Sequence, residues 1–124
     1  MPVWRNNWLL VESGEIDAPS FGTAEALEAR KQPMPVEQRW LKVEYQTLRR
    51  LPATNDILFT VRTLLEPVTI IADVPGAAAC LAASMRGMSP LLLEYKGVTP
   101  EATPAVLAFL DEIAAREGAG ARAR

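Results

Sequence analysis

Apolar and polar residues alternate in three segments of the first half of the chain, and this alternation predicts β-strands. The first strand spans residues 3–11. Its apolar residues lie on both sides: Trp4, Trp8 and Leu10 on one, and Val3, Leu9 and Val11 on the other. The second and third strands, residues 40–51 and 57–65, are separated by Pro-Ala-Thr-Asn-Asp, whose turn-forming residues predict a hairpin.

The hairpin has two faces of different character, and the register that pairs its more apolar faces is the expected one. That face, expected to meet the core, comprises Leu41, Val43, Tyr45, Thr47 and Leu51 with Ile57, Phe59, Val61, Thr63 and Leu65. The opposite face then carries polar residues of both strands, among them the group Glu44, Gln46, Thr60 and Arg62. Such a face is either an exposed surface with a Glu–Arg pair, or a polar pocket floor. In a pocket, Arg62 would hold an anion and Glu44 a cation or a proton.

Helices are expected to dominate the second half. Residues 13–39 form a long polar connection with one short helix capped by Thr23. Residues 68–73 extend or follow the hairpin, and Asp73 is expected to cap the next helix. Ser89 and Gly97 bound a second helical piece.

The last helix is predicted to open at Thr103 and Pro104 and to end at Gly118. Strands followed by helices predict an α+β fold, with a partial antiparallel sheet and C-terminal helices packed on one face. We expect one domain over residues 1–117 and a disordered tail over residues 118–124.

Composition restricts the possible function. The chain has 124 residues, 49% of them hydrophobic, which favours a packed domain. A net charge of −2 without a basic stripe argues against nucleic-acid binding. No apolar run of membrane-spanning length and no signal-peptide pattern occur, and there is a single cysteine, so we expect a cytoplasmic protein.

The chain contains no histidine, which excludes histidine-based catalytic triads, zinc sites and haem ligation from its own residues. No metal site is therefore expected. Trp4, Arg5 and Trp8, with the intervening asparagines, form either a ligand wall or core packing. Cys80 lies in an apolar helical stretch and is interpreted as a small buried hydrophobe. Glu94, Tyr95 and Lys96 are interpreted as a helix end.

Three motifs together resemble the haem-dependent oxidative N-demethylase alpha-subunit-like family, including the haem subunit of dimethylamine monooxygenase. The first is Trp4, Arg5, Asn7 and Trp8. The second is Val43, Glu44, Gln46, Thr47, Leu48, Arg49, Arg50, Leu51 and Pro52. The third is Leu58, Phe59, Thr60, Val61, Arg62 and Thr63. The chain has Tyr45 where the family has arginine, and the motifs correspond to the C-terminal part of longer family members.

The resemblance implies a PAS-like fold that binds haem and oxidises small methylated amines with O₂, using electrons from flavin and iron–sulfur partners. It assigns cofactor binding to Arg62, Arg49, Gln46, Thr60, Arg5 and Trp8. Glu44 would be the catalytic group that meets the substrate ammonium. The axial ligand is not identified, and a second polypeptide or a homodimer mate would complete the pocket. The alternative is a haem-free PAS-like module for small-ligand binding or assembly.

Overall fold

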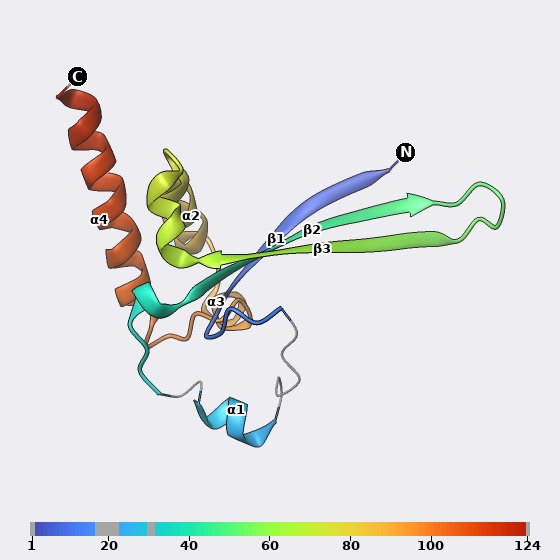
Figure 1. The fold of residues 1–124 in the computed structure, drawn as a ribbon, viewed down its shortest axis with the longest axis horizontal. Coiled ribbons are helices and arrows are strands. Elements are labelled where there is room, and N and C mark those ends of the chain that lie inside the picture. Colours follow the sequence, from blue (N-terminus) through green and yellow to red (C-terminus); the bar gives the residue numbers. More distant parts are fainter. Residues whose placement is uncertain (1, 17–22, 30–31, 124) are drawn as a thin grey trace.

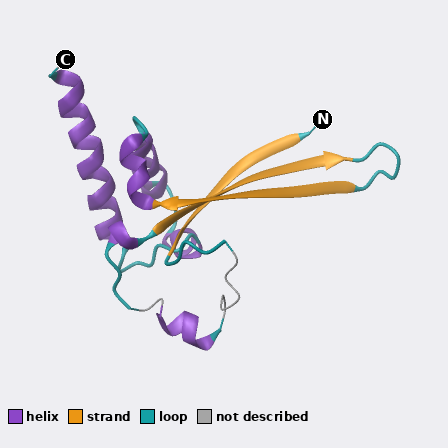
Figure 2. Cartoon of the chain, viewed as in Figure 1, coloured by secondary structure: helices purple, strands orange, loops and turns teal. Residues whose placement is uncertain are grey.

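Three antiparallel strands form one sheet, and the helices gather around one end of it (Figures 1 and 2). The computed structural model describes residues 2–16, 23–29 and 32–123. The strands are β1 (Val3–Val11), β2 (Trp40–Arg50) and β3 (Ile57–Pro67), in the spatial order β1-β2-β3. This arrangement confirms the α+β class.

Helical segments make up most of the remainder. They are α1 (Ala24–Ala29), η1 (Val36–Gln38), η2 (Val68–Asp73), α2 (Ala77–Arg86), α3 (Pro90–Tyr95) and α4 (Thr103–Arg122), where η marks a 3₁₀ helix. Local signals set several boundaries as predicted. The Ser89 hydroxyl accepts a hydrogen bond from the Leu92 N–H at 3.2 Å, and Pro90 follows it in the first turn of α3. Pro104 likewise lies in the first turn of α4.

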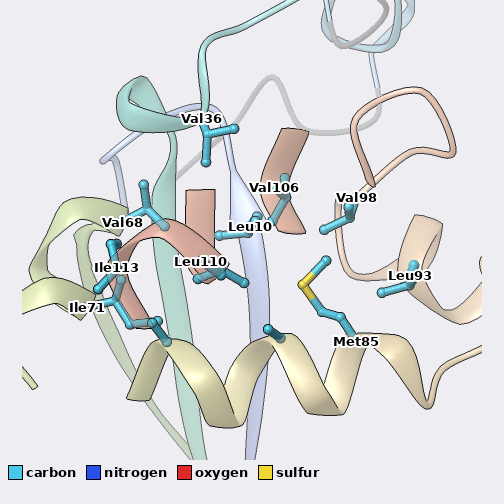
Figure 3. Packing of buried hydrophobic residues seen from close by; sticks show 12 residues of the cluster. Leu10, Val36, Val68, Ile71, Met85, Leu93, Val98, Val106, Leu110 and Ile113 are labelled. Carbon is cyan, nitrogen blue, oxygen red and sulfur yellow. The ribbon is translucent and has the colours of Figure 1, made fainter. Parts of the chain in front are cut away.

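The hydrophobic core lies at the end of the sheet that contains Leu10, where α2 and α4 pack together (Figure 3). Its buried members are Leu10, Val36, Val68, Ile71, Ala78, Ala82, Met85, Leu93, Val98, Val106, Leu110 and Ile113. Leu10 is the one member that a strand contributes to this cluster. The sheet therefore packs into the core at one end, and most of its length lies outside the core.

The far half of the sheet projects away from α2 and α4 (Figure 1). We call residues 3–6, 45–50 and 57–62 the distal arm. Large apolar side chains on it are exposed: Val3, Trp4, Tyr45, Leu48, Ile57, Leu58, Phe59 and Val61. Because neighbouring residues of a strand point to opposite faces, these side chains occupy both faces of the arm. The expectation that one hairpin face is buried along its length is therefore wrong, and Tyr45 is 40% exposed.

The hairpin register also differs from the prediction by one residue. Gln46 lies opposite Val61, Thr47 opposite Thr60, and Tyr45 opposite Arg62. Directly opposed residues share a face, so Glu44 and Gln46 lie on one face while Thr60 and Arg62 lie on the other. The predicted quartet is thus not assembled. The physical reason is that Gln46 and Glu44 of β2 form their hydrogen bonds with Arg5 and Asn7 of β1 rather than with β3.

Residues 68–73 follow the hairpin rather than extend it. They form η2 because Pro67, which has no N–H to donate to a ladder, ends β3. Two other boundary predictions were wrong. The residue before α2 is Gly76, with a left-handed φ of 78°, and Asp73 does not cap that helix. Helix α4 continues past Gly118 to Arg122, through most of the segment expected to be disordered.

Candidate functional site

A network of polar side chains joins β1 to β2 on one face of the sheet. Arg5 lies opposite Gln46, and Asn7 lies opposite Glu44. Arg5 Nε donates to Gln46 Oε1 at 2.6 Å, and Gln46 Nε2 donates to Glu44 Oε2 at 2.9 Å. Asn7 Nδ2 donates to the same Glu44 oxygen at 3.3 Å. Gln46 is only 7% exposed, so its amide is satisfied by protein groups, as burial requires.

Lys96, which follows α3, extends this network from the other side of β1. Its Nζ donates to Asn7 Oδ1 at 2.7 Å and to the Trp8 carbonyl at 3.2 Å. The same nitrogen lies 4.8 Å from the centre of the Trp8 ring. Burial lowers the pKa of Lys96, the nearby Glu44 carboxylate opposes that shift, and the Arg5 charge adds to it.

Gly97 allows the loop after α3 to lie directly on the edge of β1. The Leu10 N–H donates to the Lys96 carbonyl at 2.8 Å. Gly97 has a φ of +84°, and a Cβ at this position would lie 1.9 Å from the Leu10 carbonyl oxygen. Only glycine satisfies both constraints, and Lys96 reaches Asn7 because of this close approach.

A shallow pocket of about 200 Å³ opens on the distal arm beside the network. It is lined by Val3, Trp4, Arg5, Gln46, Leu48 and Phe59. The arrangement offers apolar walls with one amide and one guanidinium among them. None of the described residues that line it is acidic.

The family model described as haem-dependent oxidative N-demethylase, alpha subunit-like, matches residues 1–106. The chain belongs to this family. The match includes all three strands, α2, α3 and the first residues of α4, so it covers the network and the pocket. The family's description names haem dependence and an alpha subunit, which implies other subunits in the complete enzyme.

The residues that the family resemblance assigns to the cofactor and the substrate divide between the two faces of the sheet. Arg5, Gln46 and Glu44 lie together on the network face. On the other face, Arg62 lies opposite Tyr45, Arg49 opposite Leu58, Thr60 opposite Thr47, and Trp8 opposite Val43. The hydroxyls of Thr47 and Thr60 are hydrogen-bonded to each other. A single ligand lying on one face would therefore meet only one of these two sets.

Sequence reasoning missed several contributors. Lys96 was interpreted only as a helix end, and Leu48 and Phe59 were not assigned to a pocket. Each acquires its role through a partner distant in sequence, such as Asn7 for Lys96, and no local signal marks such contacts. Cys80, expected to be buried, is exposed on α2.

The pocket does not fit haem as a complete site. Haem iron is ligated in proteins by histidine, cysteine, methionine or tyrosine, and none of these is among the described residues that line the pocket. In the described part of the chain, no three His, Cys, Asp or Glu side chains are grouped for a metal ion. None of the described helices is long and apolar enough to span a membrane.

Proposed function

We propose that this chain is one component of a haem-dependent oxidative N-demethylase that acts on small methylated amines. In this proposal the chain supplies one wall of the cofactor chamber, and a second polypeptide or a second copy supplies the iron ligand. The partner would cover the distal arm. Flavin and iron–sulfur proteins would deliver the two electrons by which O₂ and a methylamine yield the smaller amine, formaldehyde and water.

The observation that carries the proposal is the distal arm, which belongs to the matched family region yet has apolar side chains exposed on both faces. Phe59 is 52% exposed on one face and Trp4 is 66% exposed on the other. Exposed large apolar side chains concentrated in one part of a fold usually mark an interaction site. Arg49, Thr60 and Arg62 share the Trp4 face and are proposed to meet the partner or its cofactor there.

Glu44 fits a supporting role better than a substrate-binding role. Its carboxylate accepts from Gln46 and Asn7, and Lys42 Nζ lies 3.7 Å from its other oxygen. These partners compensate its charge, so little of it remains for a substrate ammonium. We assign Glu44 to holding the pocket floor in place.

The experiment is to purify the tagged chain from its native cells and to follow the Soret band by size-exclusion chromatography. We expect the chain to elute in a larger complex that carries the band and makes formaldehyde from dimethylamine. The variant Phe59→Asp should release the chain from that complex without unfolding it. The proposal fails if the chain elutes alone and its deletion leaves dimethylamine-dependent formaldehyde production unchanged.

A haem-free ligand-binding or assembly module is the second candidate. The observation that favours it is that the described pocket lining contains no residue type that ligates haem iron. It predicts that the native complex, if one forms, has no Soret band. The same chromatography therefore separates the two candidates.

A further inference from the structure

The orientation of both amides in the polar network follows from the charged groups beside them. A carboxylate only accepts hydrogen bonds, whereas an ammonium and a guanidinium only donate them. Gln46 must therefore turn its NH₂ to Glu44 and its oxygen to Arg5. By the same logic, Asn7 turns its NH₂ to Glu44 and its oxygen to Lys96. Glu44 thus receives donors from both directions, and the network has one consistent arrangement.

In this arrangement Arg5 Nε donates a short hydrogen bond of 2.6 Å to Gln46 Oε1. The two terminal nitrogens of Arg5 have no acceptor among the described residues. They remain available as a planar pair of donors, the geometry that matches a carboxylate in bidentate fashion.

The surroundings of Arg5 favour an anion with an apolar body. Val3, Leu48 and Phe59 line the pocket and are 55%, 42% and 52% exposed, so a ligand would cover apolar surface there. The nearest described carboxylate in the network, Glu44, is already surrounded by donors. A cation placed in the pocket would meet the uncompensated charge of Arg5 at close range.

We propose that the pocket formed by Val3, Trp4, Arg5, Gln46, Leu48 and Phe59 binds a carboxylate attached to a flat apolar body, with the terminal nitrogens of Arg5 holding the carboxylate. Gln46 and Glu44 are positioning residues that fix the guanidinium. This proposal does not depend on haem ligation and applies under either candidate function. The carboxylate can belong to a free acid or to the propionate of a porphyrin.

The test compares three ligands of matched shape by titration calorimetry: 2-naphthoate, the neutral 2-naphthalenemethanol and the cationic 2-naphthylmethylammonium. Charge-assisted hydrogen bonds predict that the native chain binds the carboxylate at least about tenfold more tightly than the alcohol. The ammonium should bind most weakly. Protoporphyrin IX and its dimethyl ester form a second pair, which tests the porphyrin source in the same way.

Two variants and one matched control locate the effect. Arg5→Met keeps most of the apolar stem and should abolish the preference for the carboxylate, while Arg5→Lys should restore part of it. Arg116→Met removes an exposed arginine from α4, outside the distal arm, and should leave the preference unchanged. Thermal unfolding of each variant checks folding, and the ligand comparison on the native chain needs no variant.

The two ligand pairs distinguish the two sources of the carboxylate. Tighter binding of 2-naphthoate than of the neutral alcohol supports a site for a free acid. Tighter binding of the carboxylate in the porphyrin pair alone supports a porphyrin carboxylate. Equal affinity within both pairs, no binding of any ligand, or equal loss in Arg116→Met and Arg5→Met would overturn the proposal. None of these results depends on whether the native complex carries haem.

Discussion

The two ends of the sheet differ in which side chains they bury. At the helical end, Leu10 is 1% exposed and packs into a core of apolar side chains. On the distal arm of the same strand, Val3 is 55% exposed, while the polar Gln46 on the neighbouring strand is buried. The helical end is organised for stability. The arm exposes large apolar side chains while it buries the polar Gln46, the opposite of what stability alone favours, and this is why we propose that the function lies there.

The largest expected effect tests the junction between the two ends. Gly97→Ala places a Cβ against the Leu10 backbone at a φ that disfavours side chains, so we expect a loss of about 4 kcal/mol or more in unfolding free energy. The matched control is Gly118→Ala in α4, where a Cβ meets open space, and it should stabilise by up to about 1 kcal/mol. Urea unfolding measures both. Near-equal effects would contradict the close contact.

A second comparison tests the two ends directly. Leu110 is fully buried, and Leu110→Ala should lower the unfolding free energy by about 3 kcal/mol through lost burial and a residual cavity. Leu48 on the arm is 42% exposed, and Leu48→Ala should cost no more than about 1 kcal/mol. Guanidinium unfolding of the isolated chain gives both values. A larger loss for Leu48→Ala would show that the arm is packed.

A third prediction concerns Lys96 and pH. Its folded pKa is lowered from 10.5, so between the folded pKa and about 10.5 only the unfolded state holds the proton. Stability attributable to Lys96 therefore rises with pH over that window and is flat below it. Lys96→Met should remove this alkaline rise and cost about 1 kcal/mol at neutral pH, because the oxygens of Asn7 and Trp8 lose their donor.

Thermal melts across neutral and alkaline pH measure this difference between the native chain and Lys96→Met. Lys42→Met is the control, because it also removes a lysine near Glu44 but leaves Lys96 in place. Its alkaline rise should persist. If Lys96→Met keeps the rise, the burial of Lys96 is not its cause.

The smallest expected effect belongs to the ion pair between α2 and α4. Arg86 Nη2 lies 2.5 Å from Asp111 Oδ2, and both side chains are about half exposed. The hydrogen bond from Arg86 lowers the pKa of Asp111, so its contribution is present above the usual Asp pKa and is lost as the pH falls through the folded value. Arg86→Ala should lower the melting temperature slightly at neutral pH and low salt, and not at all in acid or high salt.

Local signals in the sequence were sufficient for the fold class and for several helix boundaries. Ser89 with Pro90, and Thr103 with Pro104, mark helix starts through interactions within one turn, which a sequence displays directly. The hairpin was predicted in the same way, and its loop closes with the Leu51 N–H bonded to the Asp56 carbonyl.

The register and the candidate site could not be predicted from the same signals. Pairing the apolar faces of β2 and β3 predicts the register only where a core covers one face, and none of the described core residues lies on the distal arm. The polar side of β2 is instead satisfied by Arg5 and Asn7 from β1, with Lys96 behind them. These partners are far apart in sequence, so the alternation of residues along one strand cannot predict the contacts between them.

The contact between β1 and the loop after α3 also bears on how the chain folds. Lys96 and Asn7 are 89 positions apart, yet they share a hydrogen bond, and the Leu10 N–H closes on the Lys96 carbonyl beside it. Contacts of such long range form only after the intervening chain has lost much of its freedom, which slows folding. We expect the β2–β3 hairpin and the α2–α4 pair to form early and β1 to dock last. The pocket, which depends on Arg5 and Val3, would then be the final part of the molecule to assemble.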